Sequence, residues 1–411
     1  MCKKQSTKVN ISILNQYIAE CKSALACNAK IGKCFEKVFI DALQLYMSIP
    51  DRINFLQFGR YGKYCEQTYR NNFEKADFDS FAFNTSLAGK ILSGSRKAIA
   101  IDPSYIGKSG HKTPWIGYLW SGVAQSMKRG LEILGVGLVD ADDRDCVALS
   151  AVQTPDTVTL DNESKNLVEW YVAVLTDKKE QLQELTRNVV ADAYFSKESF
   201  VSPMCNEGFE VISRFRNDAV LYYPTTKERT GKRGRPFLYD GKIDFADLDL
   251  SRCETHSTDK GKLYSLKAYA KSLKRMVKLV VWYPEDGSAR WQLYFSTNAE
   301  MQGKDIIDIY RTRFQIEFCF WDAKQHAGLT QCQSTSVNKL AFNFNASLTS
   351  INLTKAASKS LGMPFSISSC KTVIHNAYML ERFISVSGLN PNTQLIEKLI
   401  KELVLFTAKA A

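Results

Sequence analysis

Four polar side chains of different chemistry recur at helical spacing between residues 300 and 326. Tyr310, Arg313, Glu317 and Lys324 stand at offsets of 0, 3, 7 and 14. At about 100° per residue they fall within an arc of about 60° on one helix face. Such a face can be a solvated surface with paired charges. The helix also carries the following apolar neighbours: Phe314, Ile316, Phe318, Phe320 and Trp321. We therefore expect it to be largely buried, with its polar stripe facing a cleft or a ligand.

Two aspartates lie at the ends of separate apolar runs that are typical of buried strands. Asp102 ends residues 97–102, and Asp192 ends residues 189–192. A carboxylate in such a place is costly without a partner. Each of the two could simply cap the segment that follows it, and for either one alone this alternative is equally good.

Together with Glu317, these acids would form a set of three carboxylates, which repel one another unless a cation neutralises them. Hard oxygen ligands suit Mg²⁺ or Mn²⁺. Two such ions about 4 Å apart can activate a nucleophile and stabilise the leaving oxygen in phosphoryl transfer. On the same stripe, Arg313 and Lys324 would then hold phosphates, the first as a planar fork and the second as a point charge.

At these positions the chain resembles a known family. The pattern Tyr310-x2-Arg313-x3-Glu317-x6-Lys324 is similar to the signature of a branch of bacterial insertion-sequence transposases of the DDE type. Further segments also resemble this family, namely residues 101–106 (IDPSYI), 190–195 (VADAYF), 213–216, 231–236 and 297–298. The resemblance spans roughly residues 96–330. It departs at Pro103-Ser104, where many members have Asp-Thr or a similar pair.

The resemblance implies a ribonuclease-H-like α/β fold, a mixed sheet flanked by helices and interrupted by a β-rich insertion. It implies that Asp102, Asp192 and Glu317 bind two Mg²⁺ (or Mn²⁺) ions per active site. Relatives nick a transposon end, form and reopen a hairpin, and join the freed 3′-hydroxyl to target DNA. Residues equivalent to Tyr310, Arg313 and Lys324 contact phosphates at the transposon end.

We expect five regions along the chain. Residues 1–92 are a helical, DNA-end-binding region, 93–216 the first part of the ribonuclease-H-like core, 217–298 the insertion, 299–335 the signature helix, and 336–411 a helical C-terminal region. Expected helices cover residues 33–46, two short segments within 53–73, 166–189, 300–326 and 395–409. Expected strands cover residues 97–102, 131–139, 146–152, 189–192, 209–215, 262–272, 276–283 and 290–296.

A surplus of positive charge favours polyanionic partners. The 411 residues contain 54 Lys and Arg against 43 Asp and Glu, a net charge of +11. Much of the excess lies in the insertion, where residues 262–278 hold six cations and no acid. Lys232, Arg233 and Arg235 form a basic turn. A DNA-backbone surface is the favoured interpretation, and a solvated strand edge protected by lysines is the alternative. Relatives can also stack an insertion tryptophan on a flipped base, for which Trp282 and Trp291 are available.

No apolar stretch is long enough to span a membrane, and no secretory signal is visible. The eleven cysteines contain no Cys-x-x-Cys pair, so we interpret them as reduced thiols of a cytoplasmic protein. The expected partners are the terminal inverted repeats and target DNA, bound by a homodimer in a synaptic complex. Two other hypotheses are a catalytically inactive DNA-binding relative and a nuclease of the same fold.

Overall fold

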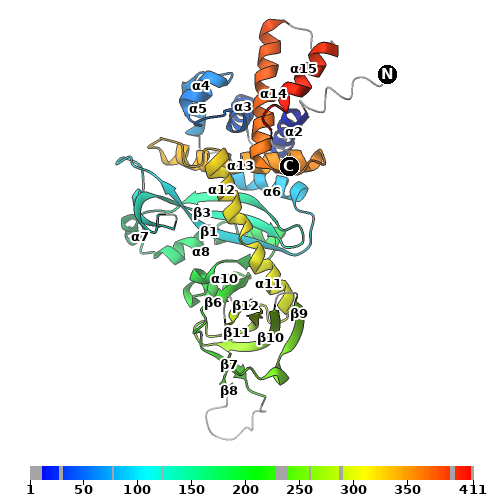
Figure 1. Cartoon of the computed structure of the whole chain (residues 1–411). Helices are drawn as coiled ribbons and strands as arrows, with labels where there is room; N and C mark the ends of the chain where they lie inside the picture. Colours follow the sequence, from blue (N-terminus) through cyan, green and yellow to red (C-terminus); the bar gives the residue numbers. More distant parts are fainter. Residues whose placement is uncertain are drawn as a thin grey trace.

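The computed structural model describes residues 12–26, 31–75, 78–122, 124–226, 239–258, 261–286, 290–388 and 394–408 (Figure 1). The helices before the first strand are α2 (Ser12–Ala26), α3 (Lys33–Ser48), α4 (Phe55–Tyr61), α5 (Glu66–Phe73) and α6 (Ser80–Ile91). Those that follow are α7 (Thr157–Asn162), α8 (Leu167–Thr176), α9 (Lys179–Leu185), α10 (Glu198–Asn206), α11 (Gly303–Thr312), α12 (Gln315–His326), α13 (Val337–Ser360), α14 (Ile367–Ser387) and α15 (Gln394–Val404).

The first strands form a mixed sheet with a diagnostic order. They are β1 (Lys97–Gly107), β2 (Gly117–Ser121), β3 (Ser126–Asp140), β4 (Asp145–Gln153), β5 (Asn188–Val190) and β6 (Glu210–Phe215). β1, β3 and β4 form an antiparallel meander, whereas β5 runs parallel to β1 and β6 runs parallel to β5. The spatial order β4-β3-β1-β5-β6, with helices packed against it, is that of a ribonuclease-H-like fold. The expected fold class is therefore confirmed.

The strands of the expected insertion continue the same sheet. They are β7 (Leu221–Pro224), β8 (Tyr239–Lys242), β9 (Glu254–Thr258), β10 (Gly261–Ala270), β11 (Arg275–Pro284) and β12 (Gln292–Ser296). β12 pairs antiparallel with β6, and β11 and β10 follow it outward. The resulting sheet has twelve strands among the described residues. In Figure 1 its green strands lie below the part that contains β1 and β3.

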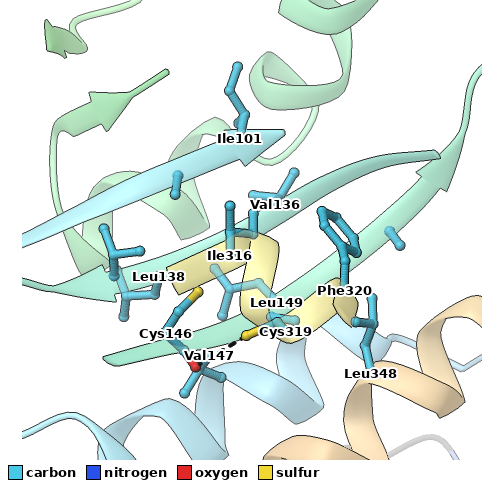
Figure 2. Packing of buried hydrophobic residues seen from close by; sticks show 14 of the residues in the cluster. Ile101, Val136, Leu138, Cys146, Val147, Leu149, Ile316, Cys319, Phe320 and Leu348 are labelled. Carbon is cyan, nitrogen blue, oxygen red and sulfur yellow. Dashed lines mark hydrogen bonds between the residues drawn. The ribbon is translucent and has the colours of Figure 1, made fainter. Parts of the chain in front are cut away.

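Helix α12 crosses one face of β1, β3 and β4 because two glycines on β3 make room for it. A Cβ atom at Gly135 would lie 2.2 Å from Phe320 Cζ, and one at Gly137 would lie 3.3 Å from Ile316 Cδ1, both on α12. Figure 2 shows Ile316, Cys319 and Phe320 of α12 packed against the strands. This close approach fixes the height of the signature helix above the sheet.

On the far side of β4, the long helix α13 is attached by amide side chains. Asn352 donates to the carbonyl of Ala148 (2.8 Å), and its Oδ1 accepts from the Ala148 N–H. Asn345 makes the same pair of contacts with Ala151. These buried amides satisfy the strand's polar backbone groups, and so hold a helix against an edge that would otherwise be unpaired.

Two expected helices differ from those observed. The helix expected over residues 166–189 is divided into α8 and α9, and it ends at Leu185 because Val189 and Val190 are buried in β5. The helix expected over 300–326 begins at Gly303 and is interrupted between Thr312 and Gln315. The polar residues before it bind other groups: Thr297 Oγ1 accepts from the N–H of Val211, and Asn298 Oδ1 accepts from the N–H of Glu300.

Within the described ranges, no helix has both the length and the hydropathy to cross a bilayer. Every cysteine in this part of the chain carries a free thiol, as expected from the sequence.

We predict that Gly135→Ala destabilises the protein by about 1–3 kcal/mol, because the added methyl group overlaps the buried ring of Phe320. Chemical denaturation followed by circular dichroism measures this change. The matched control is Gly117→Ala in β2, where an added Cβ meets no atom within 4 Å. We expect the control to be neutral or slightly stabilising. Equal stability of the two variants would contradict the close-approach argument.

Candidate active site

The residues of the polar stripe converge on strand β1. Arg313 lies between two acids, with Nη1 3.3 Å from Asp102 Oδ1 and Nη2 2.9 Å from Glu317 Oε1. About two turns beyond Glu317 along α12, Lys324 Nζ donates to Ser104 Oγ at 2.9 Å. Asp102 and Ser104 alternate with Pro103 along the strand, so both point to the face that α12 covers.

Strand pairing places Asp192 level with Asp102. In the parallel register, Ile99 is paired with Val189 and Ala100 with Val190. Each aspartate follows the second pair by two residues. Asp192 lies just beyond the end of β5, whereas Asp102 lies within β1, which continues to Gly107 instead of ending at Asp102 as expected from the sequence. Asp192 also accepts the N–H of Tyr194 at 2.9 Å and caps a 3-10 turn, Ala193–Phe195. The capping role considered from the sequence is thus real for Asp192, and it leaves the second carboxylate oxygen available.

The acids interact electrostatically at Asp102. Burial raises the pKa of the Asp102 carboxyl to about 7; the cation of Arg313 acts in the opposite direction, and the negative charges of Glu317 and Asp192 add to the rise. Burial also lowers the pKa of Lys324, an effect that nearby Asp102 opposes. The site therefore holds its excess negative charge at a cost in free energy, and an additional cation would relieve that cost.

The donor chemistry at this site suits a hard divalent cation, because carboxylate oxygens are the ligands that Mg²⁺ and Mn²⁺ prefer. Among the described residues, however, no group of three or more His, Cys, Asp or Glu lies close enough to hold a metal ion. The guanidinium of Arg313 lies between Asp102 and Glu317 instead. Its Nε is buried without a hydrogen-bond partner. The acids thus have the ligand atoms that a divalent ion prefers. In this structure, however, the cation between Asp102 and Glu317 is the guanidinium of Arg313.

Tyr310 is 7% exposed and packs edge-on against Tyr294, with 5.0 Å between the ring centroids. The guanidinium of Arg313 lies 5.9 Å from its ring centroid. Burial raises the pKa of the Tyr310 phenol, so it stays protonated at neutral pH. Tyr310 is therefore a buried neighbour of the Arg313 guanidinium.

The expectation that α12 is largely buried is wrong for three of its aromatic residues. Phe314, Phe318 and Trp321 are 49%, 57% and 56% exposed. They lie at offsets of 0, 4 and 7, on the helix face opposite the buried Ile316 and Phe320. A count of apolar residues did not reveal this division, because both faces of the helix are apolar.

The basic residues of the insertion are less available than the sequence indicated. Lys278 is buried and paired with Glu254, while Lys267 pairs with Glu300 and Lys274 with Glu198. The acids come from other segments, which a local charge count misses. The turn at residues 231–236, with Lys232, Arg233 and Arg235, lies outside the described residues.

The insertion tryptophans are likewise engaged. The guanidinium of Arg311 lies over Trp282, 4.5 Å from the ring centroid, and that of Arg290 lies 4.6 Å from the ring centroid of Trp291. Neither ring is among the exposed large side chains, whereas Trp120 and Trp321 are.

Sequence reasoning also missed the role of Ser104, which it treated only as a departure from the family pattern.

Comparison with known proteins gives one family. Residues 172–353, less than half of the chain, match the family model described as "Transposase DDE domain". The matched segment contains Asp192 and the whole stripe from Tyr310 to Lys324, and supports a relationship to DDE transposases. A solved structure titled "Cryo-EM structure of piggyBac transposase synaptic complex with hairpin DNA (SNHP)" is 12% identical, with a TM-score of 0.42 over 98% of this chain and 86% of that one. None of the curated proteins compared with the chain matches it.

The raised pKa of Asp102 predicts a pH-dependent effect of Asp102→Asn in metal-free buffer. The folded protein keeps a proton at Asp102 that the unfolded chain releases near pH 4, so this stabilisation is present at low pH and is lost as the pH rises through about 7. We therefore expect the variant to be more stable than the wild type at pH 8, and this advantage to shrink by up to about 3 kcal/mol at pH 4.5.

Urea denaturation at the two pH values, with a chelator present, measures the effect. A difference in unfolding free energy between variant and wild type that is the same at both pH values would contradict the assignment.

Proposed function

We propose that this protein is a DDE transposase of an insertion sequence, which cleaves the ends of its element and joins them to target DNA. One observation carries the proposal. Asp102 and Asp192 lie at the same level on adjacent parallel strands, each two residues beyond the last paired residues, and Arg313 links Asp102 to Glu317 on the signature helix. The family-model match over residues 172–353 supports the same reaction class.

In this proposal Asp102, Asp192 and Glu317 hold two divalent ions, Mg²⁺ or Mn²⁺. Bound ions would activate the attacking oxygen and stabilise the leaving oxygen of a phosphodiester. The chain's own cations have a separate task. Lys324, held by Ser104, and Arg313, supported by Tyr310, would grip the phosphates of the DNA end beside the acids.

The substrates proposed are the terminal inverted repeats and then target DNA, in a cut-and-paste reaction through hairpin ends. We further propose that two copies of the chain act together in a synaptic complex in the cytoplasm. The net charge of +11 favours DNA as the partner, because released counterions strengthen binding to a polyanion. Lys232, Arg233 and Arg235 remain candidates for contacts to the DNA backbone.

A catalytically inactive DNA-binding relative is the second candidate. The observation in its favour is the guanidinium of Arg313, which lies where a metal ion shared by Asp102 and Glu317 would lie. Such a protein would bind the element ends and leave them uncut. A nuclease of the same fold would cut them without producing a joined product.

We predict that Glu317→Gln and Asp192→Asn each reduce cleavage of the element's own ends by at least about a hundredfold with Mg²⁺ present. The reason is that each change removes a charged ligand worth several kcal/mol in the transition state. Cleavage and strand transfer are followed on labelled end DNA by gel electrophoresis.

The matched control is Glu184→Gln, which neutralises an exposed acid on α9, a helix that carries none of the three acids. It should cleave at the wild-type rate. Full activity of Glu317→Gln would exclude this set of catalytic acids, and a wild-type protein that binds ends tightly without cutting them would favour the inactive relative.

Lys324→Met should weaken binding of the element ends by about tenfold or more, because it removes a charged hydrogen bond to a phosphate. A gel-shift titration in a chelator measures binding without cleavage. Lys165→Met removes a lysine that is 44% exposed and paired only locally, with Glu163, and serves as the control. If both variants bind as tightly as the wild type, the proposed role of Lys324 is wrong.

A further inference from the structure

A two-stranded ribbon extends the sheet beyond the end of the catalytic strand. The pairing of β1 with β3 stops at Gly107 and Gly130, whereas β2 pairs with Ser126–Gly130 on the other edge of β3. Residues 117–121 and 126–129 therefore stand outside the core, with β2 as the last strand of the sheet. An isolated pair of strands gains little stability by itself, so the side chains on it need another reason to be apolar.

One face of this ribbon is aromatic and open. Tyr118, Trp120 and Met127 are 69%, 63% and 55% exposed. The register places Trp120 opposite Met127 and Tyr118 opposite Arg129, so all four side chains lie on the same face. We call these four residues the ribbon face.

The ribbon face is continuous with the face of the sheet that carries Asp102. Met127 and Arg129 lie an even number of residues from Gly135 along β3, so these three positions are on the same face of the sheet. Gly135 is paired with Asp102, which therefore lies on that face too. Eight residues separate Met127 from Gly135, which is at most about 27 Å of extended strand. Between the two, Leu131 and Ile133 of β3 are buried on this face, so a DNA strand of at least about eight nucleotides would be needed to span the distance over the segments that cover them.

The chain segment that contains the ribbon carries only positively charged residues, of which Lys108 donates to the carbonyl of Cys332. Between Asp102 and Glu132 the sequence contains Lys108, Lys112, Lys128 and Arg129 and no acidic residue. Glu132 itself is engaged in the core, where Tyr171 donates to its carboxylate at 2.6 Å. An apolar surface with this charge suits a polyanion with stackable rings better than it suits a neutral protein surface.

We propose that the ribbon face binds unpaired nucleobases of a DNA strand, with Trp120 and Tyr118 as stacking platforms and the nearby cations on the phosphates. Single-stranded DNA is favoured over duplex because stacking requires an accessible base face. The inference rests on the proposed function for the origin of that strand, namely DNA adjoining the cleaved end. The binding itself does not depend on cleavage.

The test is binding of a fluorescently labelled twenty-nucleotide oligo-dT, measured by anisotropy in a chelator at about 0.1 M salt. Trp120→Ala should weaken binding at least about fivefold, as expected for the loss of one stacked base. Trp120→Phe should restore most of the affinity because it keeps an aromatic face. The oligonucleotide should also quench tryptophan emission more strongly in the wild type than in Trp120→Phe.

The matched control is Phe383→Ala on α14, which removes an aromatic side chain that is 60% exposed, similar to Trp120, outside the ribbon. It should bind the oligonucleotide like the wild type, and all variants should keep the wild-type melting temperature. Wild-type affinity of both Trp120→Ala and Tyr118→Ala would overturn the proposal.

The proposal would also be overturned if Trp120→Ala bound DNA normally but sedimented as a smaller species than the wild type. The ribbon face would then be a contact between copies of the chain. The assay separates this inference from the proposed function, because loss of oligonucleotide binding in Trp120→Ala supports the ribbon site even where the wild type cuts no ends.

Discussion

The candidate site depends on the contact of one guanidinium with two carboxylates. Asp102 and Glu317 come from residues more than two hundred positions apart, and Arg313 bridges them at 3.3 and 2.9 Å. Asp102 is mostly buried, and its raised pKa shows that the bridge does not fully offset burial and the charge of Asp192. A group of acids held together in this way is electrostatically unfavourable, and a cation bound there gains more free energy than it would at the surface.

That contact is possible only because of how the backbone packs. Glu317 on α12, and Arg313 just before this helix, reach β1 because Gly135 and Gly137 let Phe320 and Ile316 pack closely against β3. Parallel pairing of β1 and β5 sets Asp192 level with Asp102 without any side-chain contact between them. The small residues on β3 and the strand register thus determine how close the charged groups lie to one another. The helical spacing determines only which side chains face β1.

The sequence predicted the strands well, because buried apolar runs with polar ends leave few alternatives; residues 97–102, 131–139 and 146–152 all lie in observed strands. It predicted the polar stripe from helical spacing, and Arg313, Glu317 and Lys324 do face β1. It could not predict the exposure of Phe314, Phe318 and Trp321, since an apolar residue looks alike on a buried and an open face. Nor could it show that Lys278 is paired with Glu254, because that partner is distant in sequence.

The same limit explains why the sequence offered Trp282 and Trp291, and not Trp120, as candidates for stacking on a base. Both insertion tryptophans lie in a segment rich in cations, and in the structure each has an arginine over its ring: Arg311 of α11 over Trp282 and Arg290 over Trp291. Trp120 lies in a segment with fewer cations, yet no acid occurs between Asp102 and Glu132, and the edge position of β2 leaves the ring open. Because β3 carries the ribbon face at one end and the partner of Asp102 further along, one strand connects the acids to an aromatic surface on the same face of the sheet. A substrate that spans both would be held by its phosphates near Lys324 and by its bases at the ribbon, which are independent interactions.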